Sequence, residues 1–561
     1  MTATIAIEEL ESVLETPETS PLVEVQGLNV AFGRGPEQNQ VVQDVSLELH
    51  PGQCVALVGE SGSGKSVTAR TLVGLTGENS VVDAEVLNIS EHDVLNYSEK
   101  AWRTLRGRKI GFVSQDALVA LDPFRKVGAE VAESLRIHTN LNASERKEKA
   151  TAALADVGIP DPEVRAQQRS FELSGGLRQR AVIASALVTD PSVLIADEPT
   201  TALDVTLQAQ ILSLLAQAKQ RGTAILLISH DLAVVSALAD HVLVMKDGEI
   251  VERGPAQDVL HSPQHPYTRQ LRDAVPRAET REKRLAPHLP SQAAKIADAR
   301  PDVVKAGSIL QAKNLHKSFK TPGRGINHAV AGVSLEVSAG QTVGIVGESG
   351  SGKSTTARII ADLAAADSGE VLLRGSTWST LKDKHKRKLR RKIGFIYQDP
   401  LSSFDPRWSV EKILKDALLF GPQSSLSLKD RAAVLLELVD LPTSFLQRHP
   451  LQLSGGQRQR IAIARALATS PDVIICDEPV SALDVSVQAT VLDLLKDLQK
   501  ALGLAYVFIS HDLGVVHHVS DDVLVMKDGE VVESGAADDV FTAPQHPYTQ
   551  KLLTALPSLV G

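Results

Sequence analysis

The chain has 561 residues, of which 43% are hydrophobic and 23% charged, and its formal net charge is −9. This length predicts more than one domain, because one hydrophobic core rarely serves so long a chain. No apolar run approaches the roughly 18 residues that span a bilayer, and the negative balance gives no basic footprint for nucleic acid. We therefore expect a chain that does not cross a membrane alone and has no nucleic-acid partner.

The N-terminal segment, residues 1–21, is acidic and lacks the basic start and apolar core of a secretory signal. We expect a mobile tail there and a chain that stays in the cytosol. The two cysteines, Cys54 and Cys476, lie inside apolar runs. That setting predicts small buried hydrophobes, with neither a disulfide nor a metal site.

The first chemical motif is GESGSGKS at 59–66, between the β-rich run CVALVG and a helix-compatible stretch. In a G-x-x-x-x-G-K-[ST] loop, backbone N–H groups approach phosphate oxygens, the lysine reaches the β- and γ-phosphates, and the hydroxyl binds Mg²⁺. A Gly/Ser-rich turn with a solvated lysine is the alternative, and the flanking strand and helix argue against it. The predicted ATP-binding residues of this loop are Gly59, Ser61, Gly62, Gly64, Lys65 and Ser66.

Further along come FVSQD at 112–116, a charged stretch that predicts a helical insert, and then VLIADEP and AILLISH. The last two predict buried strands of a parallel sheet. Asp197 would position Mg²⁺, and Glu198 would orient or deprotonate the attacking water, because neighbours on a strand point to opposite sides. His230 would bond the γ-phosphate or that water, although a lone histidine there is more often a turn residue.

A tandem duplication follows, because every motif returns in the same order in the second half. The second loop supplies Gly347, Ser349, Gly350, Gly352, Lys353 and Ser354, with Ser354 and Asp477 toward Mg²⁺, and its catalytic candidates are Glu478, His511 and Gln398. The phrase QHPYT closes both halves, at 264–268 and 545–549. We expect an ATPase domain at 22–276, a linker at 277–307 and a second domain at 308–561. The linker is charged and interrupted by prolines, which suits an exposed tether.

The LSGG phrases and two phenylalanines are further candidates for nucleotide contacts outside the phosphate loops. The LSGG phrases open helices, so each offers a positive helix end with exposed backbone donors for another phosphate. Their residues are Ser174, Gly175, Gly176, Ser454, Gly455 and Gly456. Phe32 and Phe319 could stack on adenine, with core packing as the alternative.

Together these motifs resemble the ATP-binding-cassette family from about Leu22 onward. They include the SALD-type turn at 201–204 and 481–484. The resemblance implies two tandem α/β P-loop NTPase domains, each with a parallel-sheet core, a helical subdomain and a small β subdomain. It also implies two ATP molecules with Mg²⁺, each held by the phosphate loop of one half and the signature of the other. Gln115 and Gln398 would then lie beside the Mg²⁺ and the attacking water. Leu177 stands where the second signature has Gln457, and this leaves the equality of the two sites open.

The QHPYT segments resemble the C-terminal extension on ATPase subunits of the peptide, oligopeptide and nickel importers. This implies a peripheral ATPase at the cytoplasmic membrane face, which drives import of di- or oligopeptides or related cargo. Its partners would be two membrane permease subunits and an extracytoplasmic binding protein. Some relatives hold an iron–sulfur cluster through cysteines in this extension; none lies there, so we expect no cluster.

Two other classes compete with this importer assignment. An exporter ATPase stays open, because the permeases set direction. A soluble tandem cassette acting on ribosomes or DNA is disfavoured by the short, proline-broken linker and by the lack of zinc-binding cysteines and coiled-coil inserts.

Overall fold

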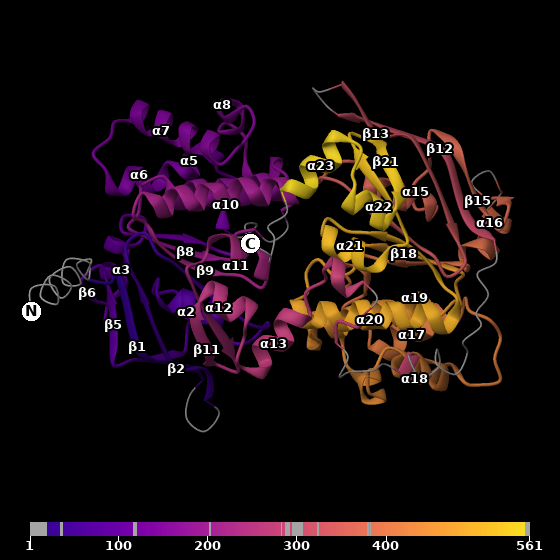
Figure 1. Ribbon diagram of the computed structural model, residues 1–561, viewed down its shortest axis with the longest axis horizontal. Helices are drawn as coiled ribbons and strands as arrows, with labels where there is room; N and C mark the ends of the chain where they lie inside the picture. The colour runs from indigo at the N-terminus through magenta and orange to yellow at the C-terminus, as the bar shows by residue number, and fades with distance from the viewer. Residues whose placement is uncertain are drawn as a thin grey trace, which may run out of the picture. The chain divides into compact units, whose positions relative to one another are not determined.

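The computed structural model describes residues 20–33, 38–115, 120–200, 203–281, 283–286, 292–293, 307–321, 325–378, 381 and 383–555. These residues divide into two compact units, one made mainly of residues 20–269 and the other mainly of residues 270–555 (Figure 1). The tail expected at 1–21 lies outside the described residues except for its last two positions.

A six-stranded sheet forms the centre of the first unit, in the order β11-β10-β3-β9-β8-β7. Its strands are β3 (Cys54–Val58), β7 (Ile110–Val113), β8 (Val193–Asp197), β9 (Ala224–Ile228), β10 (His241–Lys246) and β11 (Glu249–Pro255). Neighbours are parallel from β7 to β10, and β11 is an antiparallel edge. The predicted buried parallel strands are confirmed, since every residue of β3, β8 and β9 is buried.

The second unit repeats this sheet as β17-β18-β19-β14-β20-β21. Its strands are β14 (Thr342–Val346), β17 (Ile393–Ile396), β18 (Val473–Asp477), β19 (Ala505–Ile509), β20 (Asp522–Lys527) and β21 (Glu530–Ala536). Again only β20 and β21 pair antiparallel. The phosphate loop leaves the sheet at the end of β3 in the first unit and at the end of β14 in the second.

The small β subdomain expected in each half is an antiparallel sheet. In the first unit it contains β1 (Val23–Phe32), β2 (Asn39–Leu49), β4 (Ser80–Asp83), β5 (Val86–Ile89) and β6 (His92–Asp93). In the second unit it contains β12 (Ser308–Thr321), β13 (Gly325–Ser338), β15 (Ser368–Leu373) and β16 (Ser376–Thr377). In Figure 1, β1, β2 and β5 lie at one end of the first unit and the short helices α5 to α8 at the other.

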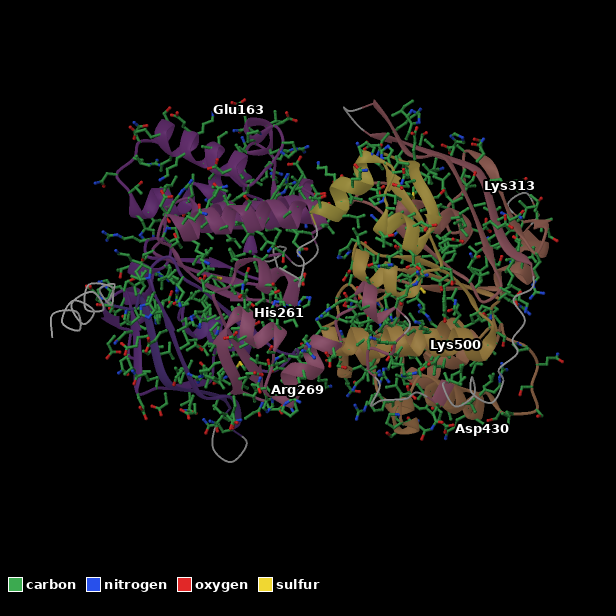
Figure 2. All side chains as sticks on the ribbon, viewed as in Figure 1. Glu163, His261, Arg269, Lys313, Asp430 and Lys500 are labelled. Carbon is green, nitrogen blue, oxygen red and sulfur yellow. The ribbon has the colours of Figure 1, made fainter. Side chains whose placement is uncertain are left out.

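Helices of the first unit are α2 (Lys65–Thr71), α3 (Glu99–Leu105), α5 (Val127–Val131), α6 (Glu133–His138), α7 (Ala143–Asp156), α8 (Pro162–Arg165), α9 (Gly175–Leu187), α10 (Val205–Gln220), α11 (Leu232–Leu238), α12 (Ala256–His261) and α13 (Pro266–Asp273). Those of the second are α15 (Lys353–Ile360), α16 (Asp383–Arg390), α17 (Val410–Leu418), α18 (Leu428–Leu438), α19 (Gly455–Leu467), α20 (Val485–Leu502), α21 (Leu513–Val519), α22 (Ala537–Thr542) and α23 (Pro547–Thr554). The helical insert predicted before each LSGG is confirmed as α5–α8 and α17–α18. Charged side chains of these inserts, such as Glu163 and Asp430, are exposed (Figure 2).

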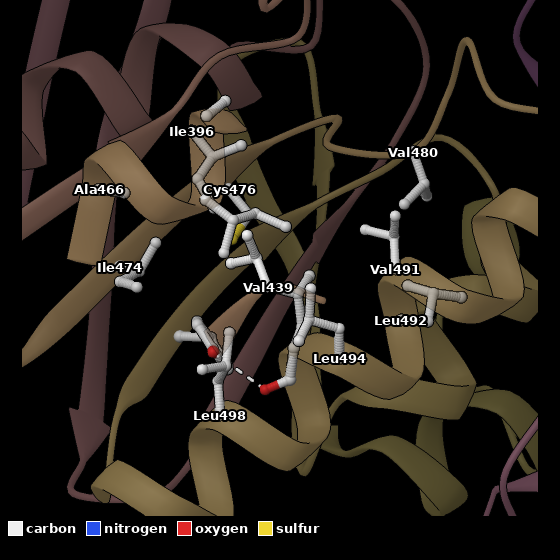
Figure 3. Packing of buried hydrophobic residues seen from close by; sticks show 14 of the residues in the cluster. Ile396, Val439, Ala466, Ile474, Cys476, Val480, Val491, Leu492, Leu494 and Leu498 are labelled. Atoms are coloured by element: carbon white, nitrogen blue, oxygen red, sulfur yellow. Dashed lines mark hydrogen bonds between the residues drawn. The ribbon is translucent and has the colours of Figure 1, made fainter. Parts of the chain in front are cut away.

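Cys476 lies in the main core of the second unit, among Ile396, Val439 and Ile474 (Figure 3). Both cysteines are fully buried, as predicted. Burial raises the pKa of the Cys54 thiol to about 12 and also raises the pKa of Cys476, so both stay protonated and serve as packing groups. Among the described residues, no helix has the length and hydropathy that a bilayer crossing requires.

The linker departs from the exposed tether that its sequence predicts. Leu285 and Ala286 are 3% and 4% exposed and belong to the core of the second unit. Their backbone N–H groups donate to the two carboxylate oxygens of Asp493 on α20, at 3.1 and 2.9 Å. Arg284 donates to Asp497, one turn further along that helix, at 2.8 Å.

A charged, proline-rich composition therefore misled the prediction for this part of the linker. The side chains of Leu285 and Ala286 pack in the apolar core, and the buried carboxylate of Asp493 satisfies their backbone N–H groups in place of solvent. Residues 287–291 and 294–306 of the expected linker lie outside the described residues.

Candidate functional site: two phosphate loops and their catalytic groups

Each phosphate loop depends on glycines for its path. Gly64 has φ +106° and forms the N-cap of α2, and Gly352 has φ +100° before α15. A Cβ atom at Gly59 or Gly347 would collide with the backbone carbonyl of Met245 or Met526. Only glycine meets these conditions, and the result is a tight loop that leads directly into a helix N-terminus, the setting in which backbone N–H groups bind phosphate.

The loop lysines are buried and held inside the curve of the loop. Lys65 Nζ donates to the carbonyls of Gly59 and Glu60 at 2.8 and 2.6 Å. Lys353 makes the same two bonds to Gly347 and Glu348 at 2.7 and 2.8 Å. Burial lowers the pKa of Lys353 despite nearby carboxylates. Each ammonium group is thus positioned where a bound phosphate would lie against the loop.

Two of the three predicted magnesium residues, a serine and an aspartate, meet in each unit. Ser66 Oγ donates to Asp197 Oδ1 at 3.0 Å, and Ser354 Oγ donates to Asp477 Oδ1 at 2.8 Å. Burial raises the pKa of both aspartates, although the serine hydrogen bonds oppose this.

A magnesium ion fits this pair of residues. Asp197 Oδ2 is buried without a hydrogen-bond partner, and a carboxylate oxygen of that kind suits a hard cation. The ion would contribute charge neutralisation at the phosphates. No group of three or more His, Cys, Asp or Glu side chains placed to bind metal occurs in the part of the chain that the structure describes.

A glutamate, a histidine and a glutamine converge next to each Ser–Asp pair. Glu198 lies 3.3 Å from His230 Nδ1 and accepts from Gln115 Nε2 at 2.9 Å. In the second unit, Glu478 lies 3.2 Å from His511 and accepts from Gln398 at 2.9 Å. The structure therefore brings together all three predicted catalytic residues of each half.

The sequence predicts that Asp and Glu point to different sides because they are neighbours on one strand. The structure gives a different reason. The strands end at Asp197 and Asp477, and the glutamates that follow have φ 50°, in the left-handed region. A non-glycine residue in this conformation is strained and often functional. This turn carries each glutamate carboxylate toward its histidine and glutamine.

The contact between glutamate and histidine shifts the pKa of both histidines and of Glu478. Burial alone would lower the pKa of His511, but the hydrogen bond and charge of Glu478 outweigh it and the pKa is raised. The pKa of Glu478 is lowered because His511 outweighs the effect of burial. The pKa of His230 is raised in the same way, because the hydrogen bond and charge of Glu198 outweigh the effect of burial. An ionised glutamate held by two donors can accept a hydrogen bond from water.

The signature serines are helix N-caps, as expected, but the two differ. Ser174 Oγ accepts from Leu177 N at 3.4 Å, and Ser454 Oγ accepts from Gln457 N at 3.3 Å. Gln457 also returns a bond, since its Oε1 accepts from Ser454 N at 3.0 Å and completes a capping box. Leucine has no acceptor to offer, so the departure noted at Leu177 removes this second bond.

The remaining predicted residues are the SALD-type turns and the two phenylalanines. Thr201 is outside the described residues, and Asp204 and Asp484 N-cap α10 and α20. Phe32 is the last residue of β1 and pairs with Asn39 of β2. Two residues further along β2, the carbonyl of Val41 lies next to Gly64 of the phosphate loop. Phe32 is partly buried against the core of its β subdomain, whereas Phe319 is 46% exposed.

The sequence reasoning missed one pair of residues, the tyrosines of QHPYT. The hydroxyl of Tyr267 accepts from the backbone N–H of Glu60 at 3.0 Å, and that of Tyr548 accepts from Glu348 N at 3.1 Å. Both donors lie in a phosphate loop. The repeat of the pentapeptide is the one signal in the sequence that could have found them.

Comparison with known proteins identifies the family. The family model described as ABC transporter matches residues 42–201 and 330–481. The model described as "Oligopeptide/dipeptide transporter, C-terminal region" matches residues 251–301 and 532–561.

Full-length relatives include the "Glutathione import ATP-binding protein GsiA" of Shigella flexneri and of Escherichia coli (strain K12). Each is 42% identical over 95% of this chain and 89% of its own length. A solved bacterial ABC transporter cassette, MJ0796, is 35% identical and matches 41% of this chain and 99% of its own, with a TM-score of 0.38. The chain belongs to the ABC transporter family, as a tandem pair of ATP-binding cassettes that each carry the oligopeptide/dipeptide transporter C-terminal region.

Proposed function

We propose that this ABC ATPase energises an importer for di- or oligopeptides or a related cargo such as glutathione. The observation that carries the proposal is that each cassette combines a Glu–His–Gln cluster with the peptide-transporter extension. Glutathione is a tripeptide, so the similarity to glutathione import ATP-binding proteins supports a peptide-type cargo. We take the cassettes as residues 22–276 and 308–561.

In this proposal, two ATP molecules lie in composite sites. The loop containing Lys65 holds one ATP with the signature of Ser454, and the loop containing Lys353 holds the other with that of Ser174. The signature phrases at the N-termini of α9 and α19 support this pairing, because helix N-termini stabilise phosphate. Magnesium would be held by Ser66, Asp197 and Gln115, and by Ser354, Asp477 and Gln398.

Partners and location complete the proposal. Two membrane permease subunits would receive the closure of the cassettes through the Gln115 and Gln398 loops and the helical inserts, at the cytoplasmic face of the membrane. An extracytoplasmic binding protein would deliver the cargo. Phe32 and Phe319 would stack on the adenines.

Hydrolysis is tested by changing both glutamates, Glu198→Gln and Glu478→Gln, in the full chain. Steady-state phosphate release should fall at least about 100-fold, because each glutamate acts on the attacking water. ATP binding should persist. Glu163→Gln with Glu437→Gln, two exposed acids of the helical inserts, is the matched control and should hydrolyse at the unmodified rate. Undiminished release by the first double variant would contradict the assignment.

The import role is tested in cells of the source organism. Replacing the gene by the version with both glutamates changed should abolish uptake of labelled peptide cargo while the protein level is unchanged. Unchanged uptake of dipeptides, longer peptides and glutathione would overturn the peptide assignment.

A further inference from the structure

The tyrosine of each QHPYT phrase contacts the phosphate loop of its own cassette. Its hydroxyl accepts the N–H of the second loop residue, Glu60 or Glu348. The carbonyl of that same residue accepts from the loop lysine, Lys65 or Lys353. One residue of the loop is therefore held on its N–H side by tyrosine and on its carbonyl side by the phosphate-binding lysine.

Each tyrosine is itself firmly placed. Tyr267 and Tyr548 are 5% and 6% exposed. The ammonium groups of Lys246 and Lys527 lie over their rings, 5.1 and 5.2 Å from the ring centres. Burial raises the pKa of the Tyr548 hydroxyl to about 12. The hydroxyl thus stays protonated, with its oxygen lone pairs available to accept the loop N–H.

The rest of the pentapeptide fastens the tyrosine to the sheet. His265 Nδ1 accepts from Tyr267 N at 3.2 Å, and Glu252 of β11 accepts from the N–H groups of Gln264 and His265 at 2.7 and 3.1 Å. The second cassette repeats these bonds at 3.1, 2.7 and 3.1 Å, through His546 and Glu533. Two copies with the same network make a chance contact a poor explanation.

We propose that Tyr267 and Tyr548 are positioning residues for nucleotide, which set the phosphate loop in its binding conformation through the amide of Glu60 or Glu348. The inference rests on the proposed ATP binding at these loops. The extension also becomes part of the nucleotide site, since a movement of α13 or α23 would shift the hydroxyl and with it the loop. ATP and ADP both place a β-phosphate in such a loop, so the contact serves both nucleotides equally.

Removing the hydroxyl alone tests this role. Tyr548→Phe keeps the ring and its cation contact but leaves the Glu348 amide without its acceptor. The dissociation constants for Mg-ATP and Mg-ADP should both rise about three- to tenfold at the altered cassette, the range expected for loss of one net hydrogen bond. Because ground state and transition state lose the same contact, KM for ATP should rise with kcat unchanged. Tyr267→Phe should do the same in the first cassette.

Tyr506→Phe is the matched control. Tyr506 is also buried, and its hydroxyl donates to the Leu495 carbonyl at 3.0 Å in the main core of the second unit. It pairs with Thr342 at the start of β14, the end of that strand away from the phosphate loop. This variant should lower the unfolding temperature while nucleotide affinity stays at the unmodified value. Equal nucleotide affinity in Tyr548→Phe and the unmodified chain would overturn the inference, as would an equal loss of affinity in Tyr506→Phe.

A second measurement does not depend on the variant folding well. Hydrogen exchange of the unmodified full chain should show slower exchange in residues 264–271 and 545–552 when Mg-ADP is added, because loop and extension share a hydrogen bond. Unchanged exchange in both segments at saturating Mg-ADP would overturn the inference. An unmodified chain that binds neither nucleotide would instead contradict the proposed function.

Discussion

At the scale of single residues, the two signatures differ by one side chain. Gln457 bonds back to Ser454 N and completes a capping box, which Leu177 cannot do at Ser174. A capping box satisfies two helix-end donors reciprocally, and losing one of them destabilises the first turn. The first signature helix is therefore the less firmly capped of the two.

Exchanging these residues tests the difference. Leu177→Gln should raise the free energy of unfolding of the first cassette by about 0.5–1 kcal/mol, and Gln457→Leu should lower that of the second by a similar amount. Urea unfolding of the full chain, followed by hydrogen exchange in each signature helix, measures both. A loss of stability in Leu177→Gln would show that leucine makes a compensating contact.

The placement of the candidate site residues was largely predictable from sequence. Lys65, Asp197 and Glu198 lie in short motifs with local flanking strands, so their position at the end of a buried strand could be expected without coordinates. The φ of 50° at Glu198 could not be predicted, because the sequence reads as a continuing strand. Nor could the bond from Glu60 to Tyr267, since it joins residues 207 positions apart.

At the scale of elements, part of the linker is buried although its composition predicts an exposed tether. Residues 278–280 form a short 3₁₀ helix against α21, where Thr280 Oγ1 lies 3.3 Å from His518 Nδ1. Burial, with Lys496, His517 and Arg281 nearby, lowers the pKa of His518 to about 4. The sequence signals exposure through proline and charge, and it does not reveal that helices α20 and α21 supply buried partners.

The docked linker predicts a specific acid sensitivity. The pKa of His518 is lower in the folded state than its ordinary 6.5, so the unfolded chain takes up the proton first. Stability is full above pH 6.5 and is lost as the pH falls toward 4. Between pH 7 and pH 5, the second cassette should lose about 2 kcal/mol more in the unmodified chain than in His518→Asn. The measurement is urea unfolding at the two pH values.

His92→Asn provides the control, because His92 is exposed on β6. The His92→Asn variant should lose as much free energy of unfolding between pH 7 and pH 5 as the unmodified chain. An equal acid loss in His518→Asn and the unmodified chain would mean that His518 does not carry the effect.

At the scale of the whole molecule, the proposed function depends on two cassettes acting as a pair. The sheet order of the first unit recurs in the second, and each unit has its own phosphate loop, Ser–Asp pair and Glu–His–Gln cluster. The fold of each cassette was predictable because motif order and buried strands repeat. The proposed pairing rests on the signature helices, and a tether between cassettes would give each a high effective concentration of the other.

Nucleotide trapping tests this pairing most directly. With Glu198→Gln and Glu478→Gln blocking hydrolysis, Lys65→Ala combined with Ser454→Arg damages one proposed site twice, whereas Lys65→Ala combined with Ser174→Arg damages both sites. The first combination should trap about one nucleotide per chain and the second almost none, as two separate composite sites require. Equal trapping by the two combinations would contradict the account.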